Sequence, residues 1–153
     1  MPVLTEPPSM GDVLKYEVNP NYTREVVTLL AGMPYPVGSV LGKITASGKY
    51  TQTPATGAAG SQEADGSQTS VSVLLYPVNA TLADAVGIVV TRGPAIVSRA
   101  ALAYGATVDD GTKIAAKITQ LAAAGIVARD GVCCPTVPRG RPQGPRAPSQ
   151  ARG

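Results

Sequence analysis

Short apolar runs separated by glycine and proline dominate the chain between residues 24 and 98. The runs are rich in valine, isoleucine and leucine, and they are too short for most helices, which is typical of β-strands. Glycine or proline follows most of them, and these residue types favour turns. We expect strands at residues 24–30, 37–46, 49–53, 71–78, 86–91 and 95–97, with turns at 31–36, 47–48 and 92–94.

Residues 109–124 have the longer period of an amphipathic helix. Thr107 followed by Asp110 resembles a capping box, and Gly125 is a typical C′ residue, so the helix is expected within 107–125. A narrow apolar stripe predicts one helix lying on a sheet. The stripe consists of Ile114, Ile118, Leu121 and Ala122, and Lys113, Lys117 and Gln120 fall largely outside it.

Four prolines in the first twenty residues predict an extended N-terminal arm over residues 1–20. Within the arm, DVLKYEV (residues 12–18) alternates as a strand does. One face of this segment is wholly apolar or aromatic and needs a surface to bury it. That surface belongs either to a partner protein or to the domain's own sheet. Leu14, Tyr16 and Val18 fall on the apolar face, and Val13, Lys15 and Glu17 fall on the other.

Two segments have too few large apolar residues to pack. Residues 53–70 are mostly small or polar, which predicts a flexible surface loop. Residues 131–153 contain five prolines, four glycines and four arginines, which predicts a disordered basic tail. The domain itself is therefore expected at 21–130. Cys133 and Cys134 are adjacent at the edge of the tail, and we interpret them as reduced thiols without a role.

The composition is poor in charge. Charged residues make up 15% of the 153 residues, against about 25% in an average soluble domain. This fits either a subunit that buries much of itself in an assembly or a tight monomer with polar loops. The net charge of +3 comes from the tail, because the rest of the chain has nine basic and ten acidic residues. All six aromatic residues are tyrosines, a residue type common at protein interfaces.

The chain contains no histidine. This excludes histidine-dependent nucleophile pairs, histidine general bases and histidine-ligated zinc, although a carboxylate enzyme remains open. We predict no catalytic, cofactor-binding or metal-binding residues. No apolar stretch approaches the ~20 residues of a membrane span, and the first residues lack the pattern of a signal peptide. The sequence therefore favours binding over catalysis.

Taken in order, five segments resemble the bacteriophage head decoration protein family, the relatives of the lambda head decoration protein. The resemblance covers roughly Thr5 to Arg129. It implies a mixed α+β, mainly β domain, small, compact and barrel-like (β-tulip-like), with one main helix and no enzymatic activity. The tail after Asp130 departs from the family pattern, so no function is transferred to it. The segments are DVLKYEV, REVVTLLAGMPYPVGSVLGKITASGKYTQ, SVLLYPV, GIVVTRGPAIV and LAAAGIVAR.

The resemblance also implies a structural virion protein on the outer surface of the capsid, made in the bacterial cytoplasm. Family members form homotrimers at threefold positions of the expanded head and clamp the major capsid protein, to which their N-terminal arm adds a strand. No cofactor, small-molecule substrate, membrane or nucleic acid is implied, and a chain without residues 2–18 is expected to fold. The arm residues are Val3, Leu4, Val13, Leu14, Tyr16 and Val18, and the residues expected at the trimer or capsid surface are Tyr22, Tyr35, Tyr50 and Arg92.

Two functions of other classes stay open. A small β module that binds a ligand or carbohydrate predicts a monomer with a defined pocket. A basic-tailed nucleic-acid accessory protein predicts binding that is lost when residues 131–153 are removed. Four arginines without interleaved aromatic residues favour a solvated tail over a nucleic-acid site.

Overall fold

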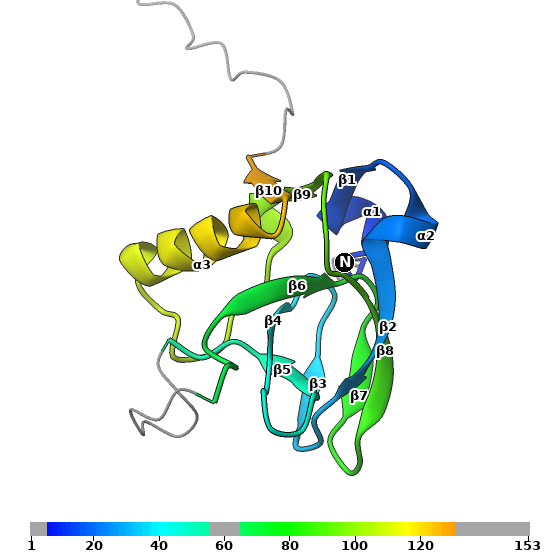
Figure 1. The fold of residues 1–153 in the computed structure, drawn as a ribbon, viewed down its shortest axis with the longest axis vertical. Helices are drawn as coiled ribbons and strands as arrows, with labels where there is room; N and C mark the ends of the chain where they lie inside the picture. Colours follow the sequence, from blue (N-terminus) through cyan, green and yellow to red (C-terminus); the bar gives the residue numbers. More distant parts are fainter. Residues whose placement is uncertain (1–5, 56–64, 131–153) are drawn as a thin grey trace, which may run out of the picture.

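Five strands join edge to edge in a closed barrel (Figure 1). The computed structural model describes residues 6–55 and 65–130. Neighbouring strands are antiparallel except for β2 and β5, which are parallel and meet at the pair Leu29 and Tyr50. In barrel order the strands are β2 (Arg24–Leu29), β5 (Tyr50–Gln52), β4 (Val40–Lys43), β6 (Ser70–Leu74) and β8 (Ala85–Val90).

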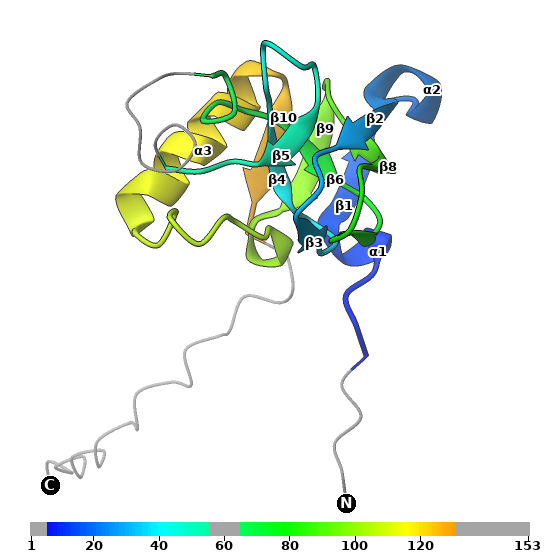
Figure 2. The same cartoon turned by 90° about the horizontal axis from the view of Figure 1, so that it is seen from below.

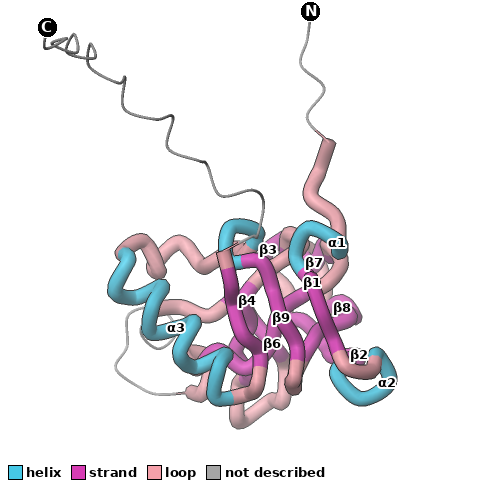
Figure 3. The backbone as a smooth tube through the Cα atoms, turned by 90° about the horizontal axis from the view of Figure 1, so that it is seen from above, coloured by secondary structure: helices cyan, strands magenta, loops and turns pink. Residues whose placement is uncertain are grey.

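A three-stranded sheet lies over one side of the barrel (Figures 1 and 3). Its central strand β9 (Ala95–Ser98) pairs antiparallel with β1 (Leu14–Glu17) and parallel with β10 (Ile126–Arg129). Both outer strands are therefore edge strands. Figure 3 shows β1 between the two short helices α1 (Met10–Val13) and α2 (Pro20–Thr23).

The main helix is α3 (Gly111–Ala123), which packs against β6 and β10 on the side of the barrel opposite α2 (Figure 2). It begins and ends inside the range expected from its period, and Leu121 of its apolar stripe is fully buried. Gly125 follows it with φ of +82°, a conformation that favours glycine at C′, and its N–H donates to the carbonyl of Ala122. A 3₁₀ turn, η2 (Arg99–Ala101), lies between β9 and α3.

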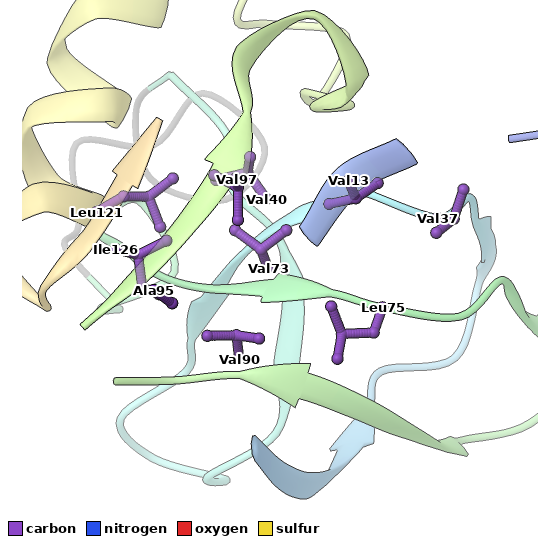
Figure 4. Close-up of a cluster of buried hydrophobic side chains, with 10 residues drawn as sticks. All are labelled: Val13, Val37, Val40, Val73, Leu75, Val90, Ala95, Val97, Leu121 and Ile126. Carbon is purple, nitrogen blue, oxygen red and sulfur yellow. The ribbon is translucent and has the colours of Figure 1, made fainter. Parts of the chain in front are cut away.

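Two apolar cores result from this arrangement. One fills the barrel and contains Leu29, Leu41 and Leu74. The other lies between the barrel and the three-stranded sheet, where Val90 and Leu75 of the barrel face Val97 of the sheet (Figure 4). Strands β4, β6 and β8 contribute to both cores through adjacent side chains, which explains why Val89 and Val90 at the end of β8 are both apolar.

The strand expected at 71–78 is divided, because β6 ends at Leu74 and the separate strand β7 begins at Val78. One expected turn also contains a strand. Residues 31–36 contain the short strand β3 (Met33–Tyr35), which pairs antiparallel with β7 (Val78–Ala80) in a separate two-stranded sheet. Pro34 stands in the middle of β3 because this strand is at an edge, where a residue without an N–H is tolerated. Half of the expected loop at 53–70 and the whole tail at 131–153 lie outside the described residues. In the described half, Thr53, Ser67 and Ser70 are buried, so the ends of this segment are packed and not a flexible loop.

Lys117 was expected outside the apolar stripe of α3, and this was wrong. Only 3% of the residue is exposed, and its Nζ donates to the backbone carbonyl of Gln68. The helix packs against both β6 and β10, so its covered surface is wider than the apolar stripe alone. The aliphatic stem of lysine can line such a surface while its amino group finds an acceptor.

The expected capping box is also absent. The hydroxyl of Thr107 accepts a hydrogen bond from the N–H of Ala55 at 2.9 Å, so it does not cap the helix. Asp110 occupies the N-cap position but makes no capping hydrogen bond with its side chain. A contact between residues far apart in the sequence has replaced the local one.

Candidate interaction surfaces

The N-terminal segment leaves the body of the protein at Ser9. Residues 6–9 are exposed and lead away from α1 (Figure 2). At Ser9 the chain becomes fixed, because the carboxylate of Asp12 accepts hydrogen bonds from the Ser9 N–H at 2.7 Å and from its hydroxyl at 3.0 Å. The backbone hydrogen bond, followed by that of the hydroxyl, lowers the pKa of Asp12.

From Met10 onwards the chain is part of the fold, which corrects the expectation of an extended arm over all of residues 1–20. Val13 is fully buried in the core beneath the three-stranded sheet, and Leu14 packs against that core. Of the residues assigned to the arm, Val13 and Leu14 are therefore held by the protein itself. Val3 and Leu4 lie outside the described residues.

A β-bulge changes the phase of β1. Leu14 pairs with Val97 and Tyr16 pairs with Ile96, so Lys15 is an extra residue on this strand. Leu14 consequently faces the core while Tyr16 faces outwards, although the two had been expected on one face. The sequence contained no signal for this bulge, because alternation alone assumes an unbroken register.

Tyr16 belongs to an apolar row that crosses the outer face of the three-stranded sheet. It lies opposite Ile96 of β9, which in turn lies opposite Val127 of β10. Tyr16 and Val127 are both exposed, and Ile96 is half-buried between them. Val18, which is also exposed, follows β1, and its N–H donates to the carbonyl of Pro94. The N-terminal segment and this row are therefore neighbours on one side of the protein.

A second cluster stands at the junction of α2 and β2. The guanidinium of Arg92 lies 5.6 Å from the ring centre of Tyr22 and forms an ion pair with Glu25. Stacking and charge pairing hold the arginine in place at the surface. Two of the four residues expected at a trimer or capsid surface, Tyr22 and Arg92, are thus brought together.

The other two are not on the surface. Tyr35 and Tyr50 are buried inside the barrel, and the hydroxyl of Tyr35 donates to the carbonyl of Leu30 at 2.8 Å. Burial raises the pKa of both tyrosines. In a chain without Trp or Phe, tyrosine supplies the large rings of the core, and its hydroxyl needs an acceptor there.

A third surface was missed by the sequence interpretation. On the outer face of the β2–β8 ribbon, Val26 lies directly opposite Ile88, and Thr28 lies opposite Val86. Val26 is 70% exposed, Val86 64% and Ile88 37%. The sequence VGIVVT is apolar almost without a break, a pattern typical of a strand covered on both faces. On the outer face of β8 only the end near Val90 is covered. The exposure of Val86 and Ile88 could therefore be seen only in the tertiary structure.

Several shallow hollows lie on the surface of the protein. One of about 480 Å³ is lined by Pro34, Tyr35, Pro36, Pro77, Val78 and Asn79, with no charged side chain. Within residues 6–55 and 65–130, no group of three or more Cys, Asp or Glu side chains is placed to hold a metal ion. Over the same residues, no helix has the length and apolarity needed to cross a membrane.

One protein family matches most of this chain. The family described as Bacteriophage lambda head decoration protein D matches residues 3–126, which is most of the chain and ends at the first residue of β10. A search of curated proteins found no match. The match covers the N-terminal segment, the barrel, α3 and two strands of the outer sheet. The chain therefore belongs to the bacteriophage lambda head decoration protein D family, structural capsid proteins located on the surface of the phage head.

Proposed function

We propose that this protein binds the expanded phage head as a homotrimer at threefold positions and stabilises it by clamping neighbouring copies of the major capsid protein. The family match over residues 3–126 carries this proposal. The low charge content and the exposed apolar surfaces support it, because both are typical of a subunit that is covered in an assembly.

The N-terminal segment before Met10 is the proposed contact with the major capsid protein. It is exposed up to Ser9, and Pro7 and Pro8 favour an extended backbone. An extended segment can add a strand to a partner's sheet, where main-chain hydrogen bonds give affinity and side-chain pockets give register. Val3 and Leu4 would supply apolar side chains for such pockets.

The apolar row beginning at Tyr16 extends this contact onto the body. The edge strand β1 directly follows α1, so a coat strand that pairs with the N-terminal segment would pass close to Tyr16 and Val18. A domain that binds the shell through both its N-terminal segment and this apolar row should dissociate more slowly than one bound through the segment alone.

Trimer formation multiplies weak contacts. Three segments on one trimer raise the effective concentration of each, so that modest single contacts give firm binding. Binding to the expanded shell, and not to the unexpanded one, stabilises the expanded state by mass action. Neither step requires covalent chemistry.

Deleting residues 2–8 tests the proposal without touching the folded body. We expect the shortened chain to remain folded and trimeric by sedimentation velocity, but to leave expanded heads undecorated. A chain that lacks residues 131–153 is the matched control, because this tail lies beyond the family match and should be dispensable. The proposal is wrong if the chain without residues 2–8 saturates heads as the full chain does.

A further inference from the structure

Aspartate is followed directly by glycine at three places in the chain, residues 65–66, 110–111 and 130–131. In such a pair the main-chain nitrogen of the glycine can attack the carboxyl carbon of the aspartate, because no Cβ shields that nitrogen. Residue 131 lies outside the described residues, so the structure compares the first two pairs. Both have the same chemistry, and only their surroundings differ.

The pair at residues 65–66 is held by its neighbours. The carboxylate of Asp65 accepts hydrogen bonds from the N–H of Ser67 at 2.9 Å and from its hydroxyl at 2.5 Å. The N–H of Gly66 donates to the side-chain carbonyl of Gln68 at 3.1 Å. Gly66 is also crowded, because an added Cβ would lie 2.5 Å from the hydroxyl of Thr45. The attacking nitrogen and the attacked carboxyl group are therefore both engaged.

The pair at residues 110–111 is open. Both residues are exposed, and the side chain of Asp110 makes no capping hydrogen bond. Lys113, one turn further along α3, is paired with Asp109 instead. Gly111 begins the helix, so its N–H has no intrahelical acceptor, and an added Cβ would meet nothing within 4 Å. This first turn lies at the end of α3 farthest from β10 (Figure 1).

We propose that Asp110 is a site of isoaspartate formation in the folded protein, and that the fold protects Asp65 from the same reaction. The nitrogen of Gly111 attacks Cγ of the protonated carboxyl group of Asp110. A C–N bond forms and a C–O bond breaks, and the carboxyl hydroxyl leaves with the amide proton as water. A water molecule then opens the resulting five-membered ring. Opening at the former main-chain carbonyl leaves the chain running through Cγ, and the net reaction consumes no reagent.

The two sites differ in what must move before the ring can close. The backbone of Asp110 is extended, with ψ of 146°, so the bond between its Cα and its carbonyl carbon must rotate to bring the nitrogen to Cγ. This rotation moves only exposed residues at a helix end, where local opening is easy. At Asp65 it breaks the hydrogen bonds to Ser67, which is 1% exposed. The hydroxyl of Ser67 is also the main cause that lowers the pKa of Asp65, which disfavours the protonated form that reacts.

The product changes the start of α3 and leaves the rest of the fold in place. Isoaspartate adds a methylene group to the main chain and turns the former carbonyl of Asp110 into a free carboxylate. The N–H of Ile114, which donates to that carbonyl at 3.0 Å, loses its partner. The buried residues of the helix, Lys117 and Leu121, lie beyond this turn. The modified chain is therefore expected to stay folded with a frayed first turn.

Incubation of the full chain at mildly acidic pH, below its unfolding temperature, tests the proposal. Digestion followed by electron-transfer fragmentation locates isoaspartate at each position. The references are two synthetic peptides, residues 105–113 and residues 62–70, which have the same sequences without the fold. We expect the fold to slow the reaction of Asp110 by less than about 10-fold relative to its peptide, and that of Asp65 by at least ~100-fold.

Two variants identify the reaction. Asp110→Glu keeps the charge but requires a larger ring, and Gly111→Ala places a Cβ beside the attacking nitrogen in open space. Both should keep the circular dichroism spectrum and remove most of the modified product at this position. The inference fails if Asp110 is protected as strongly as Asp65, if Asp65 reacts as fast as in its peptide, or if the product persists in Asp110→Glu. None of these results depends on binding to the phage head, so the proposed function is tested separately.

Discussion

The carboxylate of Glu17 accepts a hydrogen bond from Nε of Arg24 at 3.1 Å and forms an ion pair with the same guanidinium, which joins the end of β1 to the start of β2. Thr23 donates its hydroxyl to the same carboxylate at 2.8 Å. Only 11% of the Glu17 side chain and 25% of the Arg24 side chain are exposed. This contact helps to fix the three-stranded sheet to the barrel.

Glu17→Gln should weaken this junction. The hydrogen bond from Arg24 is the main cause that lowers the pKa of Glu17 below its ordinary value of 4.5. The pair therefore stabilises the fold above that pH, and the contribution is lost as the pH falls through the lowered pKa. We expect Glu17→Gln to reduce the free energy of unfolding by about 1–2 kcal/mol at pH 7, and by much less at pH 3. Urea unfolding at both pH values measures this, and an equal loss at both would contradict the assignment.

Lys117→Met should change the dependence of stability on pH in the alkaline range. Burial lowers the pKa of Lys117 from its ordinary value of 10.5, so the unfolded chain binds the proton more tightly than the folded chain. The free energy of unfolding of the wild type should therefore rise relative to that of Lys117→Met as the pH increases from 7 to 10. The tyrosines also ionise in this pH range, but they are present in both proteins. The difference between the two free energies of unfolding at each pH therefore removes their contribution.

Lys113 provides the control on the same helix. It is an exposed lysine whose Nζ lies 2.7 Å from the carboxylate of Asp109. We expect Lys113→Met to change the free energy of unfolding at pH 7 by less than about 0.5 kcal/mol. A Lys117→Met curve parallel to that of the wild type would show that Lys117 is not buried in solution.

Two glycines with similar backbones should respond differently to alanine. Gly38 has φ of +80°, and an added Cβ would lie 2.1 Å from the carbonyl oxygen of Ala101. Gly48 has φ of +71°, and its Cβ would meet nothing within 4 Å. We expect Gly48→Ala to cost about 1 kcal/mol for the left-handed backbone alone, and Gly38→Ala about 3 kcal/mol or more. Thermal unfolding compares the two, and equal costs would contradict the close approach of η2 to Gly38.

The two possible boundaries of the N-terminal arm make different predictions for folding. A chain without residues 2–8 loses only residues before the cap of α1 and should unfold at the same urea concentration as the full chain. A chain without residues 2–18 also loses β1 and the buried Val13, which should cost about 3 kcal/mol or more. If the longer deletion were as stable as the full chain, β1 would not belong to the body.

The helix and strands that depend on local periodicity could be predicted from the sequence. The barrel strands follow from short apolar runs bounded by glycine and proline, and α3 follows from its stripe and from Gly125. The family was recognised in the order of these segments, and the match over residues 3–126 confirms it.

What the sequence did not reveal depends on contacts between distant segments. The bulge at Lys15 reverses the phase of β1, and packing on two strands buries Lys117. Tyr35 and Tyr50 were expected at the surface because tyrosine is common at interfaces, but here they fill the barrel. The exposure of Val26 and Val86 depends on where the three-stranded sheet ends, which no local pattern encodes.

Quantitative binding of the full chain to expanded and unexpanded heads of its own phage tests the central claim most directly. We predict saturation of expanded heads at three copies per threefold position, almost no binding to unexpanded heads, and decorated heads that resist heating better than bare ones. Absence of binding to expanded heads, or equal binding to both forms, would contradict the account.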